Sequence, residues 1–580
     1  MRTIQKNSGT DLIVTNGQLV NVHTGEIYAA NVIIRGSKIL RIDESSAKPA
    51  DSLRVIDAEG AYLAPGLLDG HIHIECSKLS VTMFAKAVII HGTTSVVSGL
   101  DQIYAVAGLN GVRAFLNESK STPVKIFWGA PFKMPYTIPR STLAYNFGPK
   151  EHRISQDWPE CIGIWETVRE FVLGGDQATA EAMRLATENR LPVFGCAPMA
   201  RGNPLSQYVA AGVRADHESY SAPETYEKLR NGMSIMIRES SVAHFLKENI
   251  KVITQNKVDP RRIGFCTDDV TATDIIRRGH LDELVRMTIR EGVDPIKAIQ
   301  MATVNCAEIY RIDHLVGSIA PGHIADILLV DKPETFNVKK VIANGQLVAV
   351  NQKMIMDLRP PRRSRSLTHT FHVNNIKPRE LTVKAPHLSR VRVLSMKISD
   401  DVPFVRKRRD IELDVKNGVV RPDSEQDALY VSVVERYGKT NHRPVAFISG
   451  FGLKAGAMAS SSSPDDNNIL CIGTGSEDMA RAINHIIRKR GGQVVVKDDK
   501  VQEFLPLPIG GIVADLEPEE MSKSEMALDD AARSLGCRFS KPFMHMIFLS
   551  ITAIPDYAIT DRGLVDYLAL KVVNPVLGPV

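Results

Sequence analysis

The chain lacks the features that would place it in a membrane, outside the cell or on nucleic acid. No apolar run reaches the length of a membrane span, and the N-terminus MRTIQKNSGTDL has no apolar stretch of signal-peptide length. The seven cysteines never form a Cys-x-x-Cys pair, which suits a reducing compartment. The net charge is only +5, and no long run of Lys and Arg accompanies an aromatic motif. We therefore expect a cytoplasmic protein that binds neither a membrane nor nucleic acid.

The sequence also has no glycine-rich phosphate loop after its first buried strand, although strand-like and helix-like segments alternate along residues 65–313. This alternation predicts an α/β fold, a (β/α)8 TIM-like barrel, with helices at positions such as 175–189 and 279–292. A doubly wound open sheet is the alternative, which the missing loop disfavours. The predicted strands are 67–74, 93–98, 124–130, 161–166, 192–197, 211–216, 234–239 and 262–268.

Two β-rich flanks enclose the predicted barrel, at residues 1–64 and 314–356. Asn16-Gly17 is a strong signal for a hairpin turn. The five residues from Asn344 to Val348 repeat those from Asn16 to Val20. We therefore expect the two flanks to build one small β-sandwich domain together.

The composition changes after the second flank. The segment DLRPPRRSRS at 357–366 has two prolines and four arginines and is typical of a domain linker. Residues 367–580 begin with strand-like segments and continue with helical patterns at 476–492 and 517–536. This order predicts a C-terminal α+β domain of ordinary size.

Side chains that bind metals follow several of the predicted barrel strands. His71 and His73 are two residues apart, so in a strand both imidazoles point to one face. Because a barrel places its chemistry at the carboxyl ends of the strands, we expect the other strand ends to join them. Those ends supply Glu166, Cys196, His217 and either Asp268 or Asp269.

This set of side chains predicts metal-assisted hydrolysis. Histidines and carboxylates can hold one or two divalent ions, with Glu166 placed to bridge a pair. A bound ion lowers the pKa of its water to about 7 for zinc. A carboxylate after the eighth strand can accept the proton of that water and pass it to a leaving nitrogen.

Several motifs resemble the amidohydrolase superfamily and, within it, the adenine deaminase family. PGLLDGHIHIE and HGTTSVV carry the first resemblance, and RADHES (214–219), CTDD (266–269) and FGLKAGAMASS (451–461) carry the second. The resemblance implies that water replaces the amino group of adenine, giving hypoxanthine and ammonia. It also implies a metal pair of Mn, Fe or Zn, with Asp268 rather than Asp269 facing it and with Asp268 and Glu166 in catalytic roles. The residues implied to bind the pair are His71, His73, Glu166, His217 and Asp268.

The chain departs from the family pattern around the predicted site. The usual Asp-Pro-His-Glu after the second strand is Gly99 to Gln102, and the usual Arg-His-Pro after CTDD is Val270 to Ala272. Two histidines of the C-terminal pattern are Pro464 and Asn467. Because a site that hydrogen-bonds one substrate rejects analogues strongly, these changes are expected to alter specificity.

Cys196 stands where the family has a histidine ligand after the fifth strand. As a thiolate it could be a metal ligand, and as a neutral thiol it would leave the second ion weakly held. Asp101 and Gln102 follow the second strand, and we expect them to contact the substrate.

Three functions therefore remain open. The first is hydrolysis of a C–N bond in a small nitrogen heterocycle, as in adenine deaminases, and the second is the opening of a cyclic amide such as a lactam or hydantoin. The third is a metal-binding paralogue without catalytic activity. The expected partner is a small heterocyclic substrate, and the expected assembly is a homo-oligomer, a dimer as first choice.

Overall fold

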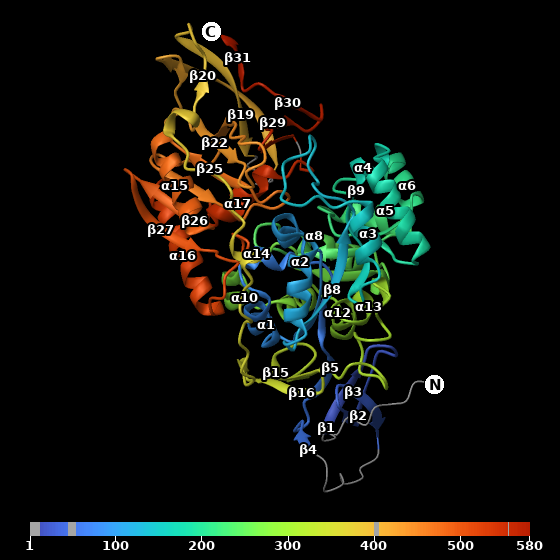
Figure 1. The fold of residues 1–580 in the computed structure, drawn as a ribbon. Helices are drawn as coiled ribbons and strands as arrows, with labels where there is room; N and C mark the ends of the chain where they lie inside the picture. Colours follow the sequence, from blue (N-terminus) through green and yellow to red (C-terminus); the bar gives the residue numbers. More distant parts are fainter. Residues whose placement is uncertain (1–11, 45–53, 399–404, 555) are drawn as a thin grey trace.

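The computed structural model describes residues 12–44, 54–398, 405–554 and 556–580. Figure 1 shows a small sheet at the lower end, a barrel in the middle and a larger β-rich part, coloured yellow to red, at the upper left. The main hydrophobic cluster runs through both the barrel and the C-terminal part, so these two share packing contacts. Within the described residues, no helix is both long enough and apolar enough to cross a membrane.

The middle part is a parallel eight-stranded sheet whose strands follow one another in chain order, as the sequence predicted. Its two ends meet, because Gly70 N–H donates to Phe265 O over 3.0 Å and Ile72 forms a parallel bridge with Asp268. The predicted barrel is thereby confirmed. The strands are β6 (Leu67–Asp69), β7 (Thr93–Ser98), β8 (Lys125–Pro131), β9 (Cys161–Val168), β10 (Val193–Cys196), β11 (Val213–Asp216), β12 (Ser234–Arg238) and β13 (Ile263–Cys266).

Helices connect these strands and surround them, with apolar faces turned toward the sheet. The longer ones are α1 (Val81–Ile89), α2 (Asp101–Ser119), α5 (Gln177–Glu188), α6 (Gly202–Ala210), α7 (Ala222–Arg230) and α11 (Leu281–Arg290). The shorter ones are η1 (Ile74–Ser77), α3 (Pro149–Ser155), α4 (Arg169–Leu173), α8 (Leu246–Asn249), α9 (Lys251–Thr254), η2 (Pro260–Arg262), α10 (Ala272–Arg278), α12 (Pro295–Met301) and α13 (Val304–Ile309).

The first barrel strand is shorter than predicted. It was expected over 67–74, but β6 ends at Asp69, and the chain turns into η1 from Ile74. The backbone between them still follows the eighth strand, since Asp268 N–H donates to His71 O (2.9 Å) and His73 N–H donates to Asp268 O (3.2 Å). Both histidines therefore keep the common orientation that the two-residue spacing indicated, although they lie beyond the strand.

The two flanks form one nine-stranded sheet, in which β5 of the first flank pairs with β14 of the second. Residues 1–11 and 45–53 of the predicted small domain lie outside the described residues. The first flank supplies β1 (Leu12–Asn21), β2 (Glu26–Arg35), β3 (Lys38–Asp43), β4 (Arg54–Asp57) and β5 (Tyr62–Pro65), and the second supplies β14 (Ile327–Val330), β15 (Val338–Ala343), β16 (Gln346–Val350) and β17 (Lys353–Met354).

The two Asn-Gly pairs of these flanks have different roles. Asn344-Gly345 is the turn between β15 and β16, but Asn16-Gly17 lies inside β1, so the hairpin predicted there is wrong. The β1–β2 register shifts between Val14 and Gly17, and Asn16 has a φ of 56°. The pair therefore forms a β-bulge, which, like a hairpin turn, needs a residue in the left-handed backbone conformation. A Cβ on Gly17 would stand 2.5 Å from the Leu63 side chain, so any larger residue there would force Leu63 to move.

The C-terminal part is an eleven-stranded sheet with two long helices and a separate three-stranded sheet. Helix α15 (Ser476–Lys489) packs on β24–β26, and α16 (Pro518–Ser534) lies between β26–β27 and the barrel helices α1 and α10. Its remaining helices are α14 (Arg365–Thr368), η3 (Pro378–Glu380), α17 (Pro542–Ile547) and η4 (Phe548–Ser550). Its strands are β18 (Val383–Lys384), β19 (Arg390–Ile398), β20 (Arg406–Lys416), β21 (Val419–Val420), β22 (Leu429–Val434), β23 (Val445–Ser449), β24 (Ala457–Ser460), β25 (Ile469–Gly473), β26 (Gly492–Lys497), β27 (Lys500–Pro506), β28 (Tyr557–Thr560), β29 (Gly563–Asp566), β30 (Lys571–Val573) and β31 (Val576–Pro579).

The segment between the barrel and the C-terminal part contains a buried ion-pair centre. The Arg363 side chain is 11% exposed and pairs with Glu118 of α2 and with Asp515 of the C-terminal part. Glu118 Oε1 also accepts from the backbone N–H of Thr82 over 2.9 Å, at the start of α1. One arginine thus ties the linker, two barrel helices and the C-terminal part together.

We expect Arg363→Ala to lower the free energy of unfolding by about 3 kcal/mol, because Glu118 would keep a buried charge without its cationic partner. Urea denaturation followed by tryptophan fluorescence measures the change. Arg359→Ala is the matched control from the same segment, since the Arg359 side chain is 84% exposed. Equal midpoint urea concentrations for the Arg363 and Arg359 variants would contradict the structural role of Arg363.

Candidate metal centre

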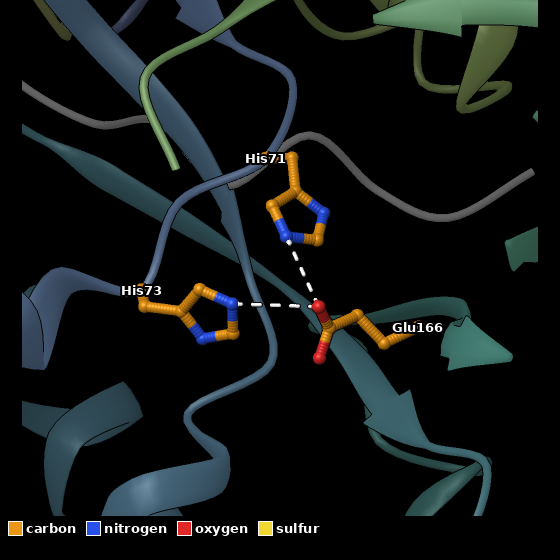
Figure 2. A group of neighbouring side chains, drawn as sticks. All are labelled: His71, His73 and Glu166. Carbon is orange, nitrogen blue, oxygen red and sulfur yellow. Dashed lines mark ion pairs between the residues drawn. The ribbon is translucent and has the colours of Figure 1, made fainter. Parts of the chain in front are cut away.

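Three imidazoles from two separate segments surround one carboxylate oxygen. Glu166 Oε1 lies 3.7 Å from His71 Nε2, 3.6 Å from His73 Nε2 and 3.5 Å from His217 Nε2. Figure 2 shows the first two of these contacts, with both rings pointing at the carboxylate. The chain reaches this point from the ends of β6, β9 and β11, as expected for the carboxyl face of a barrel.

Asp268 and Cys196 complete the cluster. Asp268 Oδ1 lies 3.8 Å from His71 Nε2 and 3.5 Å from His73 Nε2. Cys196 joins Glu166 and His217 in a group whose donor atoms all lie within 4.8 Å of one another. The structure therefore brings together all six residues that the sequence predicted as ligands.

The backbone at two of these residues is held in an uncommon conformation. Glu166 has a φ of 46° and Asp268 a φ of 56°, in the left-handed region that side chains other than glycine enter at a cost. Both residues use this conformation at the point where their carboxylates meet the histidines. The strain is located where the chain must aim a functional group.

Neighbouring groups fix the orientation of the histidine rings. His73 Nδ1 donates to Asp101 Oδ1 over 3.1 Å, and His217 Nδ1 donates to Gly195 O over 3.1 Å. Each bond uses Nδ1 and leaves Nε2 facing the cluster, which is the usual arrangement of a metal-binding histidine. The His71 ring is stacked between Trp165 and His217, with centroid separations of 3.9 and 3.6 Å.

The cluster contains a buried imidazole nitrogen that no neighbouring side chain satisfies. His71 Nε2 is buried and has no hydrogen-bond partner within the described residues, and Asp268 Oδ2, although ion-paired with Arg238, accepts no aligned hydrogen bond there. Leaving such atoms unpaired costs free energy in a protein interior. Imidazole, carboxylate and thiol donors with free electron pairs converge here, and this donor set fits a divalent ion or a pair of them.

The charges in the cluster shift the pKa values of its members. Burial lowers the pKa of His71 well below 6.5, and His217 and His73 lower it further. Burial opposes ionisation of Glu166, but His73 and His217 outweigh it and hold its pKa well below the usual range. Burial raises the pKa of Asp268 to about 7 against the opposing effect of Arg238. His71 is therefore held neutral and Glu166 ionised, the states in which both can bind a cation.

Arg238, the last residue of β12, was missed in the sequence. Its Nη1 lies 2.8 Å from Asp268 Oδ2, outside hydrogen-bond alignment, and its Nη2 donates to Asp269 Oδ2 over 2.8 Å. It also pairs with Glu218. Its place at a predicted strand end is a sequence signal, but a cationic side chain is not a metal ligand, so the ligand pattern does not include it.

A cavity extends from the cluster to a roof formed by the C-terminal part. The roof consists of Pro464, Asp465, Phe548, Ile551, Ala553 and Ile554. The buried guanidinium of Arg406 holds this roof, since it donates to the carbonyl oxygens of Phe548 (2.8 Å), Ile551 (2.8 Å) and Ile554 (3.0 Å). The site is thus built from both parts of the chain.

The two predicted substrate contacts have different surroundings. Asp101 lines the cavity while it holds His73. Gln102 is fully buried behind it and donates to Cys76 Sγ over 3.3 Å, and it is not among the residues that line the cavity. Both remain predictions as substrate contacts.

Asp465 was not predicted from the sequence. It is 8% exposed, has a φ of 72° and lines the cavity, and its Oδ2 has no hydrogen-bond partner within the described residues. Burial raises its pKa well above the usual value, with further contributions from Glu166 and Asp101. The only sequence signal was a pair of acids in the small polar segment SSSSPDDNN, which reveals nothing about the neighbouring barrel.

Two of the residues that depart from the predicted family pattern have structural roles. The Thr271 side chain accepts from Asp274 N–H and caps α10. Asn467 Oδ1 accepts from Ser463 N–H over 3.2 Å and shapes the segment that carries Pro464 and Asp465. The positions that depart from the predicted family pattern therefore contribute to loops around the cavity.

Comparison with known proteins gives matches along nearly the whole chain. Residues 62–348 match the amidohydrolase family and residues 403–571 match the adenine deaminase C-terminal domain. The chain is 53% identical to adenine deaminase 1 of Desulfotalea psychrophila over 97% of this chain and 95% of that protein. It is 52% identical to adenine deaminase 4 of Rhizobium meliloti over 98% and 95% of the two chains, and 48% identical to adenine deaminase 1 of Latilactobacillus sakei over 98% and 96%.

We expect Cys196→Ala to reduce the metal content of the purified protein from about two ions per chain to about one, because the Glu166–Cys196–His217 group would lose a donor. Elemental analysis after reconstitution with zinc or manganese measures this. Cys161→Ala is the control, since Cys161 is buried in β9 but lies in none of the donor groups. An unchanged metal content in the Cys196 variant would show that the thiol is not a ligand.

Proposed function

Because the chain belongs to the adenine deaminase family of amidohydrolases, we propose that it hydrolyses adenine to hypoxanthine and ammonia. The observation that carries this proposal is the cluster of three imidazoles, two carboxylates and a thiol at the floor of a roofed cavity. The relatives at 48–53% identity are named adenine deaminases and favour neither a cyclic-amide hydrolase nor a silent paralogue.

The proposed metal ligands are His71, His73, Glu166, Cys196, His217 and Asp268. We infer manganese, iron or zinc, because imidazole and carboxylate donors suit all three and the thiol favours the softer ions. When bound, a divalent ion supplies a positive charge that makes water acidic enough to lose a proton near neutral pH. Glu166 Oε1, central among the three imidazoles, is the donor best placed to serve two ions.

Asp268 is the proposed general base and acid. Its carboxylate lies at the cluster, with Oδ1 near His73 and Oδ2 ion-paired with Arg238. It accepts the proton of the attacking water and delivers that proton to the leaving amino nitrogen, so that ammonia departs neutral. Asp269 instead accepts from Arg238 and from Cys76 Sγ (3.1 Å), which leaves it less free to take part.

Asp465 and the roof are proposed to recognise the substrate. A purine is a flat apolar ring with polar edges, and the cavity offers it apolar walls from Phe548, Ile551 and Ile554. The unpartnered oxygen of Asp465 can accept an N–H of the ring. Asp101 is proposed to act through His73, in addition to its predicted contact with the substrate.

We also infer a cytoplasmic enzyme that acts as a homo-oligomer, a dimer in the simplest case. All seven cysteines are free, which agrees with a reducing compartment.

The first test combines metal content and ammonia release in one preparation. Two ions per chain with release of ammonia and hypoxanthine from adenine are expected. If the protein binds metal and hydrolyses a lactam or hydantoin but not adenine, the proposed substrate is wrong and a cyclic amide takes its place. Absence of tightly bound metal after reconstitution with zinc, manganese or iron would refute a metal-dependent hydrolase.

We expect Asp268→Asn to lower kcat for adenine by about 10²- to 10⁴-fold, because the amide cannot accept the proton of water. Asp269→Asn is the matched variant and is expected to keep most of the activity. Steady-state ammonia release, with metal content measured for each variant, separates loss of the base from loss of the ion. A larger loss of kcat in Asp269→Asn than in Asp268→Asn would assign the base to Asp269.

We expect Asp465→Asn to raise KM for adenine by about ten-fold with a smaller change in kcat, because one hydrogen bond to the ring would be weakened. Asp466→Asn is the control from the same segment, since Asp466 is absent from the residues that line the cavity. Unchanged KM in the Asp465 variant would contradict its role in recognition.

A further inference from the structure

A second cavity, of about 640 Å³, lies at the opposite end of the barrel from the metal ligands. Its position follows from the strands, because Arg214 is the second residue of β11 and Arg262 directly precedes β13. His217 and Asp268, by contrast, follow the carboxyl ends of these same two strands. The two sites are therefore separated by the length of the barrel strands.

Four arginines line this cavity, which we call the arginine cavity, namely Arg214, Arg261, Arg262 and Arg311. Glu308 is the one acidic residue among those that line it. No carboxylate in the described part of the chain forms an ion pair with any of the four arginines. Like charges that converge without counter-charges repel one another, so the arrangement favours an anion as ligand.

Backbone carbonyl groups fix two of these side chains without neutralising them. Arg262 Nη1 donates to Gly232 O over 2.8 Å, and Arg311 Nη1 donates to Arg190 O over 3.2 Å. Each guanidinium has five N–H donors, so both keep donors for a ligand. The guanidinium group matches phosphate oxygens with paired, charge-assisted hydrogen bonds.

We propose that the arginine cavity binds a small organic phosphate of nucleotide size, at a site distinct from the catalytic cavity. The volume lies within the range of about 300–1,000 Å³ that is typical of small-molecule sites and exceeds what a single phosphate ion needs. Pro192 and Ile309 add apolar surface on which the organic part can pack. The positive charge selects the phosphate groups.

The test uses the metal-loaded full-length protein and uridine diphosphate as the probe, since a pyrimidine avoids the proposed adenine site. Isothermal titration calorimetry is expected to show one site per chain for uridine diphosphate, weaker binding of inorganic phosphate and no binding of uridine. Affinity is expected to fall as salt increases, because exposed charges are screened.

The double variant Arg214→Ala/Arg261→Ala is expected to weaken binding of uridine diphosphate by about ten-fold or more. Its ammonia release from adenine should match that of the wild type, which also confirms that it is folded. Arg359→Ala removes an exposed arginine elsewhere and should bind as the wild type does. Absence of binding to the wild type, or equal binding to the double variant, would overturn the proposal.

Discussion

The site depends on one carboxylate oxygen of a largely enclosed side chain, Glu166 Oε1, which three imidazole nitrogens approach to between 3.5 and 3.7 Å. A charge of this kind is costly to bury, and the chain meets that cost with cationic or metal-binding partners on every side. The barrel makes the arrangement feasible, because parallel strands that end at one face deliver residues distant in sequence to one point. The left-handed backbone at Glu166 and Asp268 completes the alignment.

The C-terminal part contributes residues to this site. It supplies the roof of the cavity, and Arg406 fixes that roof through carbonyl oxygens and not through a carboxylate. Arg363 and the packing of α16 against α1 and α10 hold the two parts together. The complete cavity therefore requires both parts to be folded and docked.

The departures from the family pattern lie around the candidate metal ligands and spare most of them. Five of the six predicted ligands are those the family resemblance implies, while Cys196 stands in place of a histidine. Asp101 takes a position where the family has another residue, and there it orients His73. The chain thus keeps most of the candidate donor set and changes residues around it.

The sequence by itself determined the barrel and its six candidate ligands, because strand periodicity and residue spacing are local properties that each strand end carries. It misassigned Asn16-Gly17, since a bulge and a hairpin turn require the same left-handed backbone and only the pairing of β1 with β2 distinguishes them. Arg238, Asp465 and the arginine cavity became visible only in three dimensions. Their roles arise from contacts between segments far apart in the chain, and the free energy of such contacts has no counterpart in a local pattern.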